Sequence, residues 1–526
     1  MFIIKSRRPR ALALDEPLKH GSHRRPVTRR DFLAQGFLTG SATIVAPTLL
    51  AGLLNPNRAG ALPADLDDIA RNPALCNIQN GSGQVPFICF DLAGGANIAG
   101  SNVLVGQAGG QLDFLSTQGY AKLGLPGNML PNNATTNFID TSMGIAFHTD
   151  SAFLRGIQSK ASAAALGFVN GIVIPARSEN DTGNNPHNPM YGIAKAGARG
   201  ELLTLIGSQN SESGGNSMAP RMMINPELRP TKIDSNSDVA GLGSTGPAPV
   251  LGVQPTEAVN AAMARITGFK LGDPNHSSNT ADDPVSTRLS DDLAIKRRTQ
   301  CAYIKSAKTA EEAFADPSQF NPAGDPDIRA IFPGTEFNDR EFQRTAAIMK
   351  LVVPEKAGAG TITMGGFDYH TGERATGEMR DFRAGQCMGA VIEYAHRRGF
   401  PIMLYVFSDG SLSSNGRVDD SVNGRGKGEW TGDNQQTAAS LILVYNPGAR
   451  PMLMQPGRHQ IGAFSAGGDV VTSSSPAANN VNQLVNMVIL NYMALNGKAG
   501  DFPGLFGNVL GSSAAELDRW IGFQPL

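Results

Sequence analysis

This 526-residue chain lacks two features that would narrow its function at once: an excess of one charge and a long unbroken apolar run. Its 45 lysines and arginines face 46 aspartates and glutamates, which argues against a nucleic-acid binder because such proteins need a basic surface. No segment after residue 61 approaches the roughly 18 apolar residues of a membrane-spanning helix. Hydrophobic residues still make up 41% of the chain and charged residues 17%, so we expect a globular protein.

Several common catalytic signatures are also missing. The glycine-rich segments at 94–96 and 106–110 lack the lysine of a P-loop and the glycine spacing of a dinucleotide-binding fold. No Gly-x-Ser-x-Gly sequence is present, which disfavours a serine esterase of the α/β-hydrolase type. The His-Glu-x-x-His signature of zinc proteases is absent as well.

The first 61 residues have the layout of an export signal. Nine lysines and arginines lie in the first 30 positions, and an apolar stretch at 37–54 and the small residues at 59–61 follow. The sequence Arg-Arg-Asp-Phe-Leu at 29–33 resembles the signal of the bacterial twin-arginine pathway. A membrane anchor is the alternative, but two glycines and a proline interrupt the apolar stretch. We predict a cleaved signal peptide, the twin-arginine export machinery as a partner, and a periplasmic or secreted location without a stable membrane span.

Removal of this signal peptide at 1–61 changes the charge of the chain. The signal holds ten of the 45 basic and three of the 46 acidic residues, which leaves 35 against 43 and a net charge of −8. An acidic mature chain favours solubility, and its long-range field disfavours anionic partners such as nucleic acid.

Four cysteines, Cys76, Cys89, Cys301 and Cys387, lie in the mature part. No two of them have the Cys-x-x-Cys spacing of a metal-binding knuckle. An oxidising compartment permits disulfides, and Cys76 with Cys89 is a feasible local pair. Four cysteines allow three connectivities, between which the sequence does not choose, and buried free thiols are an equal alternative.

Apolar runs and helical periodicity alternate along the mature chain. The predicted strands lie at 85–90, 167–174, 362–364, 401–407 and 440–445. Such continuous apolar strands are typical of a parallel or mixed sheet that is buried on both faces. The predicted helices lie at 341–352, 378–398 and 480–495. We predict an α/β fold with a mixed, mostly parallel sheet flanked by helices, in which 362–407 forms a right-handed βαβ unit.

Two regions are rich in loop-forming residues. Gly, Ser, Asn, Pro and Asp dominate from about 208 to 283, with one helical stretch at 256–267. We therefore predict one domain over 62–526 with a loop-rich insertion at about 208–335. The segment 411–434 directly follows a core strand, and it exceeds the 12–15 residues beyond which loops are usually disordered or functional. Its position favours a function.

Polar side chains follow several of the predicted strands. Sites in open α/β sheets form at the carboxyl ends of strands, where carboxylates, an imidazole and an amide would here converge. These ligand types suit a hard or borderline divalent metal, for which Zn, Mg, Mn and Ca are the candidates. The predicted ligands are Asp91, Asp368, His370, Asp409, Asp433 and Asn434. The ordinary alternative for any single one of these acids is a turn residue or a helix cap.

The chain resembles a known family in three places. They are the twin-arginine signal, Phe-Asp-Leu-Ala-Gly-Gly-Ala-Asn at 90–97, and Gly-Gly-Phe-Asp-Tyr-His at 365–370. All three look like features of the family called domain of unknown function 1501, which belongs to the alkaline-phosphatase-like and sulfatase-like superfamily. The similarity covers roughly 85–205 and 335–450. It implies an alkaline-phosphatase-like fold with a metal site.

The match between individual residues is uneven. Asp368 and His370 stand as the family's Asp-x-His pair. Asp409 replaces a longer glutamate, and Asp433 with Asn434 falls where the family has Asp-His-Gly, so one imidazole is missing. This loss weakens a two-metal site, because an amide oxygen brings no charge and is a poor zinc ligand.

The resemblance also marks residues nearer the amino terminus. Asn97 takes the place of an early aspartate, and His148 and His187 resemble two histidine-containing segments of the family. The superfamily uses a Ser, Thr or modified Cys nucleophile near the first strand, and Ser101 is the candidate here. A turn or N-cap serine is its ordinary alternative.

Two functions remain open at this stage. The first is a metal-dependent hydrolase of phosphate or sulfate esters, or a relative that acts on an anionic surface polymer. The second is a non-catalytic exported protein on the same scaffold, which binds a partner or polymer in a secretion or surface-assembly system. The incomplete motif favours the second function, and the acids at the strand ends favour the first.

Overall fold

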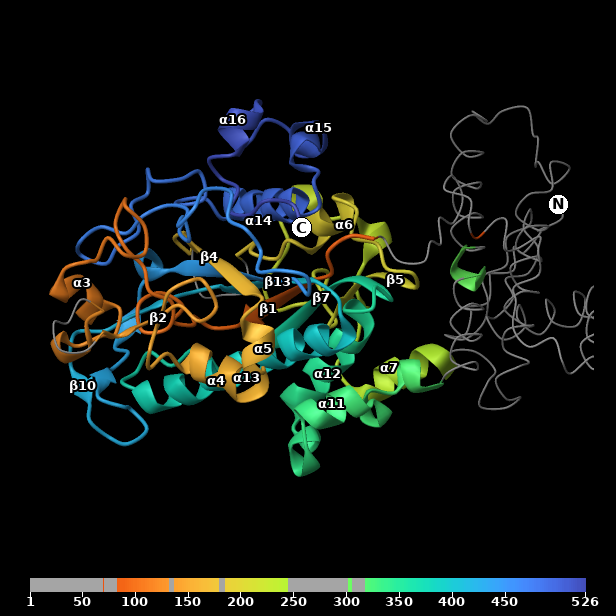
Figure 1. Ribbon diagram of the computed structural model, residues 1–526, viewed down its shortest axis with the longest axis horizontal. Helices are drawn as coiled ribbons and strands as arrows, with labels where there is room; N and C mark the ends of the chain where they lie inside the picture. The colour runs from red at the N-terminus through yellow and green to blue at the C-terminus, as the bar shows by residue number, and fades with distance from the viewer. Residues whose placement is uncertain (1–69, 71–82, 132–136, 179–184, 245–300, 305–316) are drawn as a thin grey trace, which may run out of the picture.

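The computed structural model describes residues 70, 83–131, 137–178, 185–244, 301–304 and 317–526 (Figure 1). The predicted signal at 1–61 and the predicted helix at 256–267 lie outside the described residues. Among the described helices, none combines the length and the apolar character needed to cross a membrane.

A seven-stranded sheet in the order β4-β13-β8-β1-β7-β5-β6 forms the centre of the molecule. Its strands are β1 (Phe87–Leu92), β4 (Val169–Pro175), β5 (Leu203–Gly207), β6 (Thr231–Lys232), β7 (Ala357–Met364), β8 (Ile402–Ser408) and β13 (Ala439–Tyr445). Neighbouring strands pair in parallel, except that β13 is antiparallel to both β4 and β8. This confirms the predicted mixed, mostly parallel sheet. β5 and β6 have no counterpart among the predicted strands because they are short.

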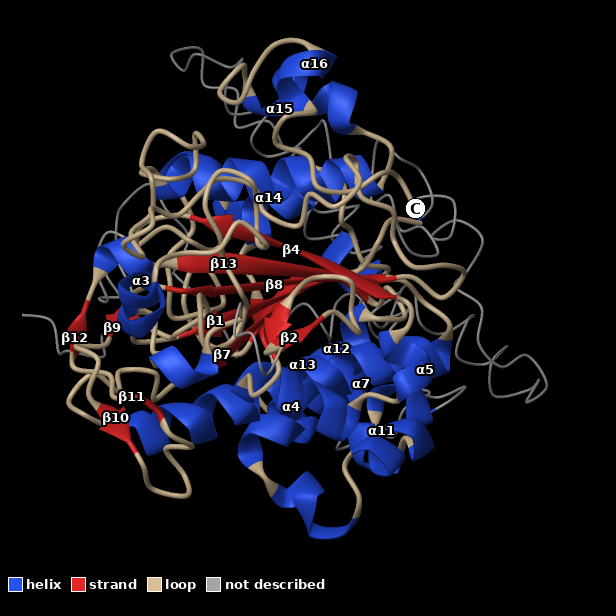
Figure 2. Ribbon diagram, turned by 60° about the vertical axis from the view of Figure 1, so that its left-hand side comes forward, coloured by secondary structure: helices blue, strands red, loops and turns tan. Residues whose placement is uncertain are grey.

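Helices cover both faces of the sheet (Figure 2). The longer ones are α4 (Ala152–Lys160), α12 (Arg340–Val352), α13 (Arg374–Arg398) and α14 (Val481–Leu495). The shorter ones are α3 (Thr117–Lys122), α5 (Ala163–Leu166), α6 (Met190–Lys195), α7 (Asn236–Ser244), α11 (Pro326–Ile331), α15 (Phe502–Phe506) and α16 (Ala514–Leu517). α6 and α14 lie on one face, and α4, α12 and α13 lie on the other (Figures 1 and 2). The predicted flanking helices are thereby confirmed.

Side chains of β1 alternate between two apolar cores. Phe87 and Cys89 belong to the core that includes α6 and α14, whereas Ile88 and Phe90 belong to the core that includes α4, α12 and α13. Because successive side chains of a strand point to opposite faces, a central strand buried on both faces must be mostly apolar. This is the physical reason that the continuous apolar runs identify the strands.

Local capping sets the ends of the long helices. The Asp339 carboxylate accepts from the backbone N–H groups of Glu341 and Phe342 at 2.9 and 3.2 Å and begins α12. The side chain of Asn480 accepts from Gln483 at 3.1 Å and begins α14 in the same way. Gly399 ends α13 in the left-handed region at φ 72°, which glycine adopts without steric cost.

Glycines bring α4 and α13 into close contact. A Cβ at Gly156 would lie 2.2 Å from the carbonyl oxygen of Phe382, and one at Gly385 would lie 2.3 Å from that of Phe153. These separations are far below van der Waals contact, so the two helices pack backbone against backbone. Part of the high glycine content therefore serves helix packing as well as loops.

The long loop at 411–434 folds back on itself in short strands. They are β9 (Leu412–Ser413), β10 (Val418–Asp419), β11 (Lys427–Gly428) and β12 (Gly432–Asp433), and β9 pairs with β12 and β10 with β11. A further pair, β2 (Ile139–Asp140) and β3 (Phe147–His148), lies outside the main sheet. The two pairs in the long loop return the chain to the end of β8.

The cysteines do not form the local pair considered above. Cys89 and Cys387 are free and buried, whereas Cys301 is disulfide-bonded. The Cys76–Cys89 pair is therefore wrong, because Cys89 lies inside β1 with its side chain in the apolar core. Its Sγ is 3.2 Å from Oγ1 of Thr361, and burial raises the pKa of this thiol.

Candidate metal centre at the carboxyl edge of the sheet

The candidate site lies where β1, β7 and β8 end together. Leu92 is in register with Met364 of β7 and Ser408 of β8, so the three parallel strands reach the same edge. The segments that leave these strands carry most of the predicted ligands. This is the edge at which open α/β sheets place their sites.

Asp368, His370 and Asp433 come together at this edge. One ligand atom from each residue lies within 4.8 Å of the others. Nε2 of His370 is 2.8 Å from Oδ1 of Asp368 and 3.7 Å from Oδ2 of Asp433. The side chains are 59%, 29% and 47% exposed for Asp368, His370 and Asp433, so the cluster faces solvent. Three of the six predicted ligands thus form one group.

Tyr369 holds the Asp-x-His segment from the inside. Its hydroxyl donates to Oδ1 of Asp381 at 2.6 Å and accepts from the backbone N–H of Asn97 at 3.1 Å. Oδ2 of Asp381 accepts from Nδ2 of Asn102 at 2.7 Å, and burial raises the pKa of Asp381 to about 7. Because Tyr369 points inward and is buried, its two neighbours in the chain are turned toward the surface.

Tyr369 and Asp381, which anchor the ligands, are not among the site residues predicted from the sequence. A tyrosine between two candidate ligands is a weak signal in sequence, because a buried tyrosine needs a partner that only the fold supplies. Here the partner comes from α13, and Gly377 leaves room for the ring. A Cβ at that glycine would lie 2.8 Å from Cε2 of Tyr369.

Asp433 reaches the cluster through the small strand pair that follows β8. Asp433 of β12 is paired with Leu412 of β9, and the N–H of Asn434 donates to the carbonyl of Ser411 at 2.9 Å. The side chain of Asn434 accepts from the N–H of Gln436 at 2.9 Å and caps a short helical turn. Asn434 therefore has a capping position, and its side chain is not one of the three clustered ligands.

Asp91 is fully buried and binds a neighbouring loop. Its Oδ2 accepts from the backbone N–H groups of Asn216 and Ser217 at 2.6 and 2.9 Å, and its Oδ1 accepts from Oγ of Ser217 at 3.1 Å. Burial raises the pKa of Asp91, although these hydrogen bonds act in the opposite direction. The carboxyl group thus ties the loop at 213–217 to the sheet edge.

Asp409 is also fully buried beside the cluster. Its Oδ1 accepts from the N–H of Gly94 at 2.8 Å, and its Oδ2 accepts from Nδ2 of Asn216 at 3.2 Å. Gly94 has φ 121°, and a Cβ there would lie 2.7 Å from the backbone nitrogen of Asp368. Asp409 therefore ties the β1 loop and Asn216 to the end of β8, and Gly94 packs closely against the backbone of Asp368.

Ser101, the candidate nucleophile, lies in a buried turn after β1. Its side chain has no exposed surface. Its Oγ accepts from Nδ2 of Asn97 at 2.6 Å and from Nη2 of Arg374 at 3.0 Å. This position suits a turn serine that satisfies buried donors, and it offers a substrate no direct access.

The two early histidines lie apart from the three clustered ligands. His148 bridges the carbonyl of Met129 at 3.0 Å and the N–H of Asp150 at 3.1 Å, and burial lowers its pKa to about 4. His187 is buried and stacks on Phe407 with ring centroids 5.7 Å apart. Neither ring nitrogen of His187 has a hydrogen-bond partner among the described residues, and burial lowers its pKa to about 3.

Comparisons with known proteins identify no relative of this chain. No family model, curated protein or solved structure matches this chain. The resemblance to the domain of unknown function 1501 family therefore stays a prediction from the motifs.

The three clustered residues fit a borderline divalent cation. Two carboxylates and one imidazole are ligands that Zn²⁺ and Mn²⁺ accept, whereas Ca²⁺ needs six to eight oxygens. Three protein ligands also leave coordination positions for water or for a bound group. The donor set and its exposure thus agree with an open cation site.

Proposed function

We propose that this protein binds a divalent cation through Asp368, His370 and Asp433 and holds the anionic group of a phosphate or sulfate ester there. The observation that carries the proposal is the convergence of three ligand atoms from two loops at the carboxyl edge of the sheet. When bound, a divalent cation would supply positive charge and Lewis acidity toward an ester oxygen. We further propose that the fold is alkaline-phosphatase-like and that the protein is exported by the twin-arginine route.

The residues of the chain have separate tasks in this proposal. The two carboxylates and Nε2 of His370 bind the cation, and Tyr369 holds two of these ligands in place from below. The mature chain has a net charge of −8 by sequence, so its overall field repels anions. A cation at this edge would supply the local positive charge that an anionic ester requires.

Binding without turnover is the second candidate function. It is favoured by the buried position of Ser101, whose Oγ already accepts two hydrogen bonds. A protein of this kind would hold an anionic ester or polymer at the cation and release it unchanged. Such a role fits an exported scaffold in a secretion or surface-assembly system.

The first experiment measures metal binding by calorimetry on the metal-stripped protein with Zn²⁺, Mn²⁺, Mg²⁺ and Ca²⁺ in turn. We expect Zn²⁺ and Mn²⁺ to bind most tightly, and we expect Asp368→Ala with His370→Ala to abolish that binding. Asp420→Ala is the matched control, because Asp420 is an exposed carboxylate of the same long loop outside the cluster. Equal metal binding by the wild type and the double variant would overturn the proposal.

The second experiment separates the two candidate functions. The metal-loaded protein is assayed with aryl phosphate and aryl sulfate substrates, and binding of phosphate is measured in parallel. Metal-dependent product release that the double variant loses supports a hydrolase. Metal-dependent binding without product release supports the non-catalytic function.

A further inference from the structure

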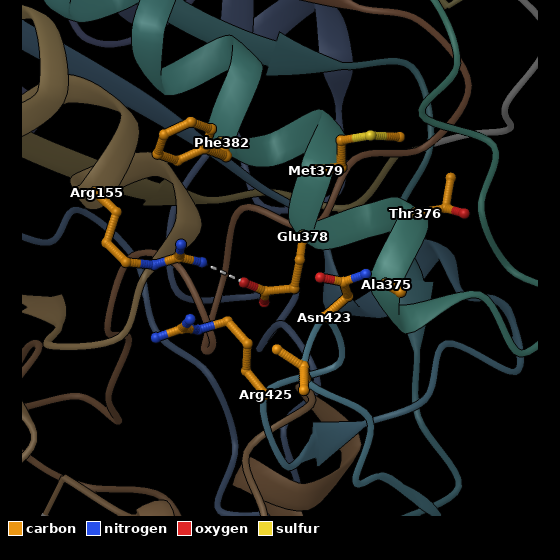
Figure 3. Close-up of a pocket in the computed structure, with 9 residues that line it drawn as sticks. Arg155, Ala375, Thr376, Glu378, Met379, Phe382, Asn423 and Arg425 are labelled. Carbon is orange, nitrogen blue, oxygen red and sulfur yellow. Dashed lines mark hydrogen bonds and ion pairs between the residues drawn. The ribbon is translucent and has the colours of Figure 1, made fainter.

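A pocket away from the metal cluster opens beside the first turns of α13 (Figure 3). It encloses about 370 Å³ between α13, Arg155 of α4 and the loop that carries Val422 and Arg425. Figure 3 shows Arg155 and Arg425 extending toward the same region next to Glu378. None of the three clustered metal ligands lines this pocket.

Four cations share two carboxylates in and behind this pocket. The connected group consists of Arg155, Arg374, Arg425, Lys427, Asp150 and Glu378. Arg155 and Lys427 bind Glu378 at 2.6 and 2.8 Å, and Arg374 binds it at 2.6 Å. Nε of Arg425 lies 2.9 Å from Asp150. With all six groups ionised, the cluster has two positive charges in excess.

Two of the four cations are buried, which makes the excess costly without a further anion, whereas Arg155 and Arg425 are 28% and 39% exposed. The side chain of Lys427 is 0% exposed and that of Arg374 is 2% exposed. Buried charges are stable only when they are paired, because the protein interior solvates them poorly. Burial acts to raise the pKa of Glu378, but Arg374 and Lys427 hold that pKa below its usual value. Glu378 is thus ionised, and its carboxylate is already paired with Arg155, Arg374 and Lys427.

The cluster has hydrogen-bond donors as well as positive charge in excess. Among the described residues, neither Nε of Arg155 nor Nε of Arg374 makes a hydrogen bond, although Nε of Arg155 lies 3.6 Å from Oδ1 of Asp150. Arg374 lies behind the pocket and does not line it. Asp381 lies near Arg374 and Glu378, but burial raises the pKa of this acid to about 7, so it supplies less than a full negative charge at neutral pH. Asp419 acts on Arg374 at longer range, without an ion pair within 4.0 Å among the described residues.

The mouth of the pocket is apolar beside these cations. Met379 is 63% exposed and Val422 is 91% exposed, and both line the pocket. Phe382 forms a further apolar wall, with the guanidinium of Arg155 lying 5.7 Å from its ring centroid. A ligand that covered these side chains would bury apolar surface while its charged end met the arginines.

We propose that this pocket binds a small organic oxyanion with a compact apolar substituent. Its phosphate, sulfate or carboxylate group lies between Arg155 and Arg425, because planar guanidinium groups pair with such oxygens through directed hydrogen bonds. Its apolar part lies against Met379 and Val422. The site needs no metal and is independent of the proposed cation site.

Calorimetry in the presence of EDTA tests this proposal with phenyl phosphate, phenyl sulfate, benzoate, inorganic phosphate and phenol as separate probes. We expect at least one of the three aromatic anions to bind about tenfold more tightly than inorganic phosphate, and we expect phenol to bind more weakly than that anion. The strongest of the three anions identifies the preferred oxyanion. Binding by Asp368→Ala with His370→Ala should be unchanged, which separates this pocket from the metal cluster.

Two substitutions separate the contributions of a charged and an apolar side chain to anion binding in the pocket. Arg425→Gln should weaken every anion about tenfold, and Arg417→Gln, at a 75% exposed arginine of the same loop, is its matched control. Val422→Ser should weaken the aromatic anions about fivefold and leave inorganic phosphate unchanged, because only the apolar contact is lost. The proposal is overturned if no anion binds, if phenol binds as tightly as the anions, or if Arg425→Gln has no effect while the folded state is retained by circular dichroism.

Discussion

Residues of the same type at equivalent strand ends have different environments here. Asp91 and Asp409 are fully buried and accept hydrogen bonds from neighbouring loops. Asp368 follows β7, the strand that pairs with the one carrying Asp91. It is instead 59% exposed and pairs with His370. Burial separates the acids that hold the edge together from those that face a ligand, and this separation is not visible in the sequence.

Ser101→Ala is expected to lower the free energy of unfolding by about 1–3 kcal/mol, because it leaves buried donors of Asn97 and Arg374 without their acceptor. Urea unfolding measures this loss. Ser142→Ala is the control, since Ser142 is exposed and should tolerate the change. A Ser101→Ala protein with unchanged stability and abolished ester hydrolysis would instead restore the nucleophile role.

His187→Phe is expected to stabilise the protein, and more at pH 5 than at pH 8. Burial lowers the pKa of His187 from 6.5 to about 3, so the unfolded chain binds a proton that the folded chain rejects between these values. Stability therefore falls as the pH drops from about 6.5 toward 3, and the loss at pH 5 is about 2 kcal/mol. Urea unfolding of both proteins at the two pH values checks this, and parallel pH profiles would contradict it.

At the scale of elements, the contact between α4 and α13 depends on the absence of side chains. Gly385→Ala places a Cβ 2.3 Å from the carbonyl oxygen of Phe153, so the helices must separate. We expect the free energy of unfolding to fall by about 1–3 kcal/mol, as for other overpacked cores. Gly504→Ala in α15 is the control, because nothing lies within 4 Å of its added Cβ. Equal stability of the two variants would show that this helix contact adapts freely.

A buried hydroxyl helps to hold the segment between β7 and α13. Tyr369→Phe removes the donor to Asp381 and is expected to weaken metal binding roughly tenfold, as loss of an outer-shell partner usually does. Calorimetry with Zn²⁺ measures the effect. Tyr120→Phe removes another buried hydroxyl, which donates to Val105, and should cost stability without changing metal affinity. Equal metal affinity in both variants would show that Tyr369 does not position the ligands.

For the molecule as a whole, the state of the cysteines gives a direct test of the fold. Cys89 and Cys387 lie in opposite cores, and burial raises the pKa of both thiols, that of Cys387 to about 12. Because the thiolate is the reactive form, we expect no thiol to react with a thiol reagent in the folded protein and two to react in urea. All four of the cysteines should react after reduction. Rapid labelling of the native protein would contradict this packing.

The sequence alone determined the layered architecture. The central strands β1 and β8 are buried on both faces and are mostly apolar, so their positions are visible as continuous runs. Only the end of β7, at 362–364, is predicted from the sequence, because glycine, alanine and threonine make up the rest of that strand. α12, α13 and α14 are visible because their caps and periodicity are local. β5 and the edge strand β6 give no such pattern, since sheet pairing holds them in place.

Only the tertiary structure decided which candidate residues meet. Asp433 reaches His370 because β12 pairs with β9, a contact between segments that no local pattern specifies. The surplus of cations around Glu378 and Asp150 is likewise invisible in a chain whose 45 basic and 46 acidic residues nearly cancel. Strand and helix positions follow from local hydrophobic periodicity, whereas burial and charge pairing depend on contacts between distant segments, and those contacts decide where a ligand can bind.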